Sequence, residues 1–170
     1  MLGIGGKELS EENAAQTAKA LNIIQPDFIR VHATGIKLES KLGEFVRDGS
    51  FTLQSEEEIV IEQKLFLQQL HEMDSYYVNE HIVNLLLEVR GNLRTEKQEM
   101  LSTIDRFLTL PPDERLLFTV GRRLNIFFRL DDLKNPKLHQ KAEESLQQIL
   151  SKNPHVDFAA LCNYVRQSQI

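Results

Sequence analysis

The sequence predicts a mainly α-helical fold with a small parallel βαβ element at its N-terminal end. Residues 1–32 contain a glycine-rich turn, an amphipathic stretch and a short apolar run, in that order. From Ser55 onward, apolar residues recur at spacings of three and four, as they do in helices that bury one face. Two parallel strands require a crossover helix between them, and the length of the amphipathic stretch fits one.

The βαβ element is predicted from its boundaries. Residues 2–6 end a strand in a glycine turn, and Ser10 is placed to cap the following helix, because a serine side chain accepts N–H groups of the first turn. Pro26 stops this helix. The apolar run at residues 28–31 forms the second strand, which we expect to be buried on both faces. No later segment is predicted to be a strand.

The rest of the chain divides into a connection and a helical region. Residues 33–50 form a long connection with one helical turn. We therefore expect residues 1–50 to hold the βαβ element and its connecting loop. Residues 51–170 form the helical region, packed with the first part as one compact unit.

The helices of the second region are predicted from their caps and apolar spacing. Ser55 and Glu58 form a capping box, in which each side chain binds the backbone N–H of the other residue. A second helix covers residues 76–89 and ends at Gly91 in the left-handed conformation. Further helices are predicted at residues 95–108, at 112–128 with a bend at Gly121, at 136–152 with Asn135 as its N-cap, and after residue 154.

Composition excludes several classes of function. The 170 residues are 41% hydrophobic and 26% charged, which is ordinary for a globular protein, and the net charge of −5 does not favour nucleic acid as a partner. The single cysteine, Cys162, excludes an internal disulfide framework. No apolar run approaches the roughly 20 residues that span a bilayer, and the first residues do not resemble a signal peptide. A cytoplasmic protein without a membrane partner is expected.

Few residues form a recognisable chemical motif. Glu56, Glu57 and Glu58 are interpreted as a helix start that favours the helix dipole, rather than as a metal site. Nothing resembles a Ser-His-Asp triad or a phosphate-binding loop. No catalytic residue and no metal ligand is therefore predicted. The five histidines also lack ligand spacing such as i, i+4 on one helix: His32, His71, His81, His139 and His155.

Three arginines, Arg122, Arg123 and Arg129, surround two adjacent phenylalanines. This pattern is compatible with binding to an anion or a membrane surface. The interpretation that we favour is a core helix whose aromatic side packs inward. In that case, the arginines pair with Asp131 and Asp132.

Several segments, in this order and spacing, resemble the C-terminal half of radical S-adenosylmethionine (radical SAM) proteins. LGIGGK at residues 2–7 resembles the fifth strand and turn of that family's partial TIM barrel, and PDFIRV at 26–31 resembles its sixth strand. Later segments resemble the helical tail of one subgroup: NLL at 84–86, GNL at 91–93, MLSTIDRFLTL at 100–110 and GRRL at 121–124.

The resemblance implies a site at the carboxyl ends of the strands. In the family, the glycine turn lets the adenosyl group of S-adenosylmethionine pack against backbone, which implies cofactor contacts in the parent at Gly3, Ile4, Gly5 and Gly6. Arg30 and His32 end the second strand. They would lie near the substrate cavity, since strand carboxyl ends form the site in open α/β folds.

The departures from the family limit the expected activity. Radical SAM chemistry needs a CxxxCxxC loop to hold a 4Fe–4S cluster, and Cys162 is the only cysteine. After the sixth strand, relatives show a Pro-Gly-Thr-Pro-Leu turn, where this chain has ATGIKL at residues 33–38. We therefore expect a fragment or remnant of a radical SAM-like iron–sulfur enzyme that is not catalytic alone and holds neither cofactor.

The alternative is a self-standing helical module for protein interaction or oligomerisation. Either reading predicts a homo-oligomer, most simply a dimer. Two parallel strands expose edges with unpaired backbone groups, and such edges tend to pair with another chain. Phe28, Ile29 and Val31 also need cover on a second face of the sheet. The sequence does not identify any other protein partner.

Overall fold

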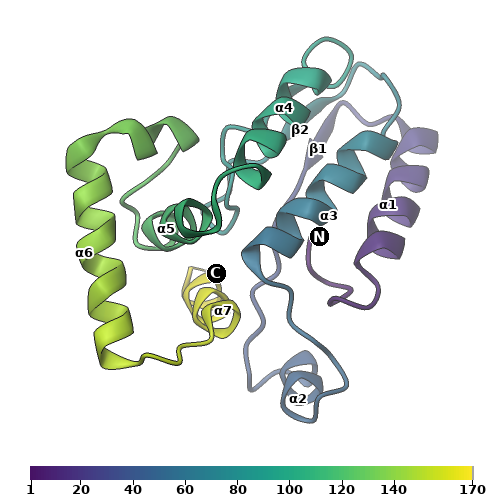
Figure 1. Cartoon of the computed structure of the whole chain (residues 1–170). Coiled ribbons are helices and arrows are strands. Elements are labelled where there is room, and N and C mark those ends of the chain that lie inside the picture. Colours follow the sequence, from purple (N-terminus) through teal and green to yellow (C-terminus); the bar gives the residue numbers. More distant parts are fainter. Residues whose placement is uncertain (170) are drawn as a thin grey trace.

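The computed structural model describes residues 1–169 and is mainly helical, with one small mixed sheet (Figure 1). The predicted fold class is confirmed. The strands are β1 (Phe28–Arg30), β2 (Tyr76–Val78) and β3 (Gly91–Asn92). The helices are α1 (Ser10–Ile24), α2 (Lys41–Arg47), α3 (Glu56–Gln69), α4 (Lys97–Leu108), α5 (Pro112–Arg123), the 3-10 helix η1 (Leu130–Lys134), α6 (Pro136–Lys152) and α7 (Phe158–Ser168).

The sheet has the strand order β1-β2-β3. Strands β1 and β2 are parallel, with Phe28 opposite Tyr76, and β3 joins β2 antiparallel. The first predicted strand is reduced to one parallel bridge between Leu2 and Ala33. In this bridge, the Leu2 N–H donates to the His32 carbonyl at 2.9 Å. Helix α1 therefore crosses over between two parallel segments, as expected of a βαβ element.

The prediction of a helix at residues 76–89 is wrong, because this stretch begins with β2. Tyr77 is fully buried and its hydroxyl accepts a hydrogen bond from Gln63 Nε2 of α3 at 3.0 Å. The apolar residues that follow lie in turns rather than on one helix face. Asn84 Nδ2 donates to the Val31 carbonyl at 2.9 Å, and Asn79 Nδ2 donates to the Leu86 carbonyl at 2.6 Å. These side-chain bonds, one local and one long-range, replace the helical ones.

Two expected helix ends also differ. Gly91 is not a helix end, because it lies in β3 and pairs with Tyr77. Helix α5 ends at Arg123 instead of continuing to residue 128, since Asn125 adopts a positive φ of 57°. The chain then turns back, and the Ile126 N–H donates to the Gly121 carbonyl at 2.7 Å.

The predicted helix caps are confirmed in two cases and wrong in one. The Ser55–Glu58 capping box is confirmed, with both reciprocal hydrogen bonds present. Asn135 caps α6 as its sequence context indicates. Ser10 does not cap α1: the N-cap position belongs to Leu9, and Ser10 Oγ donates to the Lys7 carbonyl at 3.3 Å.

The helices α1 and α3 cover one face of the sheet (Figure 1). The face that they cover carries Ile29 and Tyr77, and the Tyr77 ring lies 6.3 Å from the Phe66 ring of α3. At the other end of the molecule, α5, α6 and α7 form a second group, with α6 at its outer edge (Figure 1). None of the helices within residues 1–169 is long and apolar enough to cross a membrane.

Candidate functional site

The second face of the sheet is exposed. Phe28 of β1 is 69% exposed and Tyr76 of β2 is 41% exposed, and their rings lie 6.5 Å apart. Arg30 is exposed two residues after Phe28, and successive side chains of a strand alternate between faces. The prediction that the run at 28–31 is buried on both faces is therefore wrong: helices cover only the face of Ile29.

One edge of β1 is also open. Tyr76 N–H donates to the Asp27 carbonyl at 2.8 Å, and Val31 N–H donates to the Val78 carbonyl at 3.0 Å. Backbone groups of alternate residues in a parallel strand point to opposite edges, so those of Phe28 point away from β2. Those of Arg30 do the same, and no backbone group within residues 1–169 pairs with them there. The Leu2 bridge begins only beyond this stretch.

Two histidines stack at the carboxyl end of β1. The His32 and His81 rings lie 4.1 Å apart with an angle of 28° between their planes. Burial lowers the pKa of His32 below its usual 6.5, and the nearby charges of His81 and Arg30 lower it further. His32 is consequently neutral at pH 7 and can either donate or accept a hydrogen bond.

A cavity of about 430 Å³ lies beside β2. Its charged groups are of both signs, and Arg90 pairs with Glu80 at 2.8 Å. Burial raises the pKa of Glu88, although Leu130 N–H donates a hydrogen bond to its carboxylate at 3.1 Å. The lining residues are Tyr76, Glu80, Leu87, Glu88, Arg90, Glu96, Phe128 and Arg129.

The glycine turn lies at the same end of the sheet, because Leu2 pairs beside His32. Two of its backbone N–H groups are already engaged. Gly3 N–H donates to the buried Glu62 carboxylate at 3.1 Å, and Gly6 N–H donates to the Gly3 carbonyl at 3.3 Å. Gly3 and Gly6 have φ angles of 80° and 63°, which favour glycine. The structure thus places Gly3, Ile4, Gly5 and Gly6 in a strand-to-helix turn closed by internal hydrogen bonds.

A buried ionic cluster is the feature that the sequence did not indicate. Glu56, the first residue of α3, is 4% exposed and accepts two hydrogen bonds from Arg123, at 3.0 and 2.6 Å. Arg166 of α7 is 1% exposed and also pairs with Glu56. Burial by itself would raise the pKa of Glu56, but the two guanidinium groups outweigh it and hold this pKa below its usual value.

Hydrogen bonds from the cluster and its neighbour Asn163 connect α7 to the residues that follow β1. Arg166 Nε donates to the Thr34 carbonyl at 3.1 Å, and Arg123 Nη2 donates to the Val83 carbonyl at 3.0 Å. Asn163 makes two more bonds, accepting from the Ile36 N–H and donating to the Ile36 carbonyl. The residues after β1 are therefore held by the C-terminal helix.

The expected pairing of the arginines with Asp131 and Asp132 is wrong for Arg122 and Arg123, which are both buried. Arg123 pairs with Glu56, and Arg122 donates to the Ile82 carbonyl at 2.9 Å. Within residues 1–169, Nε and Nη1 of Arg122 have no hydrogen-bond partner. Burial lowers the pKa of Arg122 to about 10, which still leaves the guanidinium charged at pH 7.

Cys162 lies on α7 beside the cluster and is 2% exposed. Burial raises the pKa of its thiol to about 12, so that the reactive thiolate is scarce at neutral pH. The neighbouring cavity is only about 170 Å³. In the part of the chain that the structure describes, no group of three or more His, Cys, Asp or Glu side chains could hold a metal ion.

The structure therefore brings Arg30, His32 and the glycine turn to one end of the sheet, whereas the Glu56 cluster is assembled from three distant helices. The sequence signals for the cluster are limited to an acidic residue at the start of α3 and a pair of adjacent arginines at the end of α5. We compared the chain with protein-family models, with curated proteins and with solved structures, and none of them matches it.

Proposed function

We propose that this chain is the substrate-side, C-terminal part of a radical SAM-like enzyme and is not catalytic by itself. The observation that supports it is the one-sided sheet, in which α1 and α3 cover one face and leave the other exposed. In a β/α barrel, helices cover the outer face of the strands while the inner face lines the interior. Arg30 and His32 belong to the exposed face or its carboxyl end, which is where such barrels bind substrate.

The open edge of β1 supports the same proposal. The Leu2 bridge sets the direction of the neighbouring segment as parallel to β1. A further strand that lay beside Phe28 and Arg30, parallel to β1, would satisfy the backbone groups of these two residues that point away from β2. In this proposal, the guanidinium of Arg30 attracts an anionic group of the substrate. The neutral imidazole of His32 orients a polar group through one hydrogen bond.

The family's cofactors do not fit the residues present. A 4Fe–4S cluster needs at least three cysteine thiolates, and Cys162 is single, buried and held in its thiol form. The backbone N–H groups of Gly3 and Gly6 are already donated within the protein. We therefore assign no step of the reaction to this chain, and we propose a cytoplasmic location with the rest of the enzyme.

A reconstitution experiment checks the absence of a cluster. We expect anaerobic incubation of the purified chain with iron and sulfide to give no stoichiometric 4Fe–4S signal by absorption or electron paramagnetic resonance, because the thiolates are lacking. A Cys162→Ser variant is the control for adventitious iron. The expectation would be contradicted if the unmodified chain, at monomeric mass, held a full cluster and the Cys162→Ser variant did not.

Isolation of the native polypeptide from the source cell tests the proposed function. We expect an antibody raised against residues 51–170 to detect, in the source cell, either a longer polypeptide or a complex whose sequence contains CxxxCxxC. Mass spectrometry of the captured material identifies it. Capture of this chain alone, with no partner that carries cluster cysteines, would refute the proposal.

The second candidate is a self-standing oligomerisation module, and the exposed apolar residues at the end of α1 and the start of β1 favour it. Ile23 and Ile24 at the end of α1 are 77% and 67% exposed, and Phe28 follows them. Two copies of β1 could pair antiparallel across a two-fold axis and cover this surface.

Light scattering after size exclusion tests this second candidate. We expect a mass of twice the 19.6 kDa of one chain at micromolar concentration. Ile24→Lys with Phe28→Lys should give monomers, because two charges would be buried in the interface. Tyr164→Lys on α7, where the side chain is 65% exposed, is the matched control. A clean monomer mass for the unmodified chain would exclude the module.

A further inference from the structure

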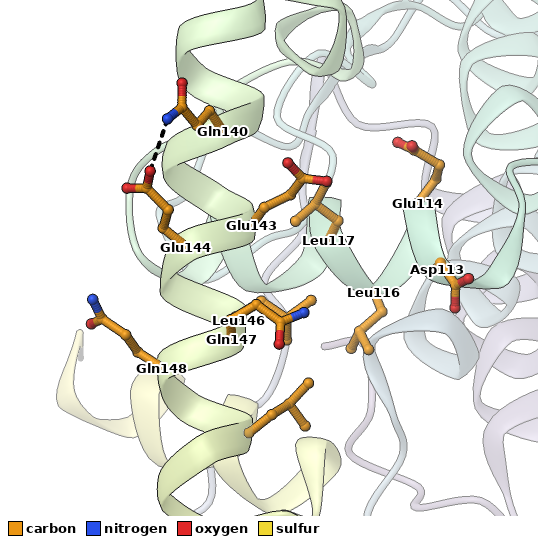
Figure 2. Close-up of a pocket in the computed structure, with 11 residues that line it drawn as sticks. Asp113, Glu114, Leu116, Leu117, Gln140, Glu143, Glu144, Leu146, Gln147 and Gln148 are labelled. Carbon is orange, nitrogen blue, oxygen red and sulfur yellow. Dashed lines mark hydrogen bonds between the residues drawn. The ribbon is translucent and has the colours of Figure 1, made fainter.

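A groove of about 810 Å³ separates α6 from α5. Figure 2 shows Glu143 of α6 and Glu114 of α5 on its two sides. This groove lies at the outer edge of the molecule, away from the sheet (Figure 1), so it is independent of the site proposed above. Its lining residues are Asp113, Glu114, Leu116, Leu117, Gln140, Glu143, Glu144, Leu146, Gln147, Gln148 and Leu150.

The floor of the groove is apolar. Both helices contribute leucines to it, Leu116 and Leu117 from α5, and Leu146 and Leu150 from α6. Leu117 is 5% exposed, whereas the other three remain partly exposed. A floor of this kind matches the leucine-rich grooves that receive one apolar face of a helix.

Among the described residues 1–169, all charged residues that line the groove are acidic. Asp113 and Glu114 lie on α5, Glu143 and Glu144 lie on α6, and the remaining polar lining residues are glutamines. His139 lies beside the rims, with its ring nitrogens 3.5 Å from Glu114 and 3.5 Å from Glu143. The rims therefore repel anionic partners and attract cationic ones.

We propose that this groove docks an amphipathic helix of a partner protein, one that carries leucine-like residues on one face and Lys or Arg residues along its flanks. The apolar face would cover the leucines, and the basic flanks would meet the four rim carboxylates. Helix α6 has 17 residues and is about 25 Å long, enough to lie along several turns of such a helix. An anionic membrane surface would be repelled, and a second copy would bring a net charge of −5 to an acidic groove.

A designed peptide tests the proposal. The probe is a fluorescein-labelled peptide of about 18 residues, roughly five helical turns, built from Leu and Lys with the lysines on one face. We expect saturable binding by fluorescence anisotropy that weakens as salt is raised. The Glu143→Lys/Glu144→Lys double variant should bind about tenfold more weakly, since each reversal replaces an attraction by a repulsion. Circular dichroism checks that the variant remains folded.

Three controls make the result specific. Glu39→Lys/Glu72→Lys changes the net charge equally at exposed positions outside the groove and should bind the peptide within about twofold of the unmodified chain. A peptide of the same composition with scrambled order and a peptide with Glu in place of Lys should both bind poorly. Equal binding of either peptide, or equal weakening in both double variants, would overturn the proposal. A dimer that dissociates in Glu143→Lys/Glu144→Lys would reassign the groove to a second copy and refute it.

Discussion

Replacing Glu56 by glutamine should lower the free energy of unfolding by about 3–5 kcal/mol. The carboxylate is the single buried anion between Arg123 and Arg166, whose side chains are 3% and 2% exposed. Glutamine keeps the size of the side chain but removes its charge, so two guanidinium groups remain buried without a counter-charge. Chemical denaturation followed by circular dichroism measures the loss.

The neighbouring residue provides the control. Glu57 pairs with Arg115 at 3.1 Å, but its side chain is 44% exposed. Water screens this pair, so Glu57→Gln should cost below about 1 kcal/mol. If Glu56→Gln and Glu57→Gln lowered the free energy of unfolding equally, burial would not make the Glu56 ion pairs more costly to break than the exposed Glu57 pair.

The same cluster predicts a pH dependence. The pKa of Glu56 is below its unfolded value of 4.5, so the carboxylate stabilises the fold above that pH. This contribution is lost as the pH falls through the folded-state pKa. The difference in unfolding free energy between the unmodified chain and Glu56→Gln should therefore be full near pH 7 and shrink in acid. A constant difference down to about pH 3 would contradict the assignment.

Gly121→Ala should destabilise the protein by roughly 2–3 kcal/mol, even though alanine is the better helix former. A Cβ atom at Gly121 would lie 2.3 Å from the ring of Phe127. That ring is fully buried and stacks on Phe118 with centroids 5.9 Å apart, so it cannot move aside freely. Thermal and chemical denaturation measure the effect.

A second substitution separates crowding from helix propensity. Phe127→Leu in the Gly121→Ala background should recover part of the loss, because the smaller side chain leaves room for the methyl group. The same Phe127→Leu change in the unmodified chain should only destabilise, by creating a cavity. Additive losses in the double variant would show that Phe127 is not the obstacle.

Local signals in the sequence predicted the elements that depend on neighbouring residues. The Ser55–Glu58 capping box, the Asn135 cap and the end of α1 before Pro26 were all predicted correctly, since their partners lie within four residues. Strand β2 was missed because three residues of Tyr and Val are too short to reveal a period. Its turns also depend on Asn79 and Asn84, whose bonds no periodicity predicts.

For the candidate site, the sequence predicted Arg30 and His32 at the carboxyl end of a parallel strand, and both lie there. Their contact with a substrate stays a prediction. The His32–His81 stack depends on residues that are far apart in the chain, so no local pattern could indicate it. No local pattern could indicate the α5–α6 groove either, because its two walls were predicted only as separate helices.

The sequence by itself determined the fold class, the crossover helix and the lack of cysteines for an iron–sulfur cluster, because these follow from composition and short-range spacing. Only the tertiary structure decided which charges are buried. Glu56 at the start of α3 looks like any acidic residue that favours a helix dipole, and Arg166 looks like a surface residue near a helix end. Packing α7 onto the residues after β1 removes both from water, and burying a charge costs much less when an opposite charge pairs with it.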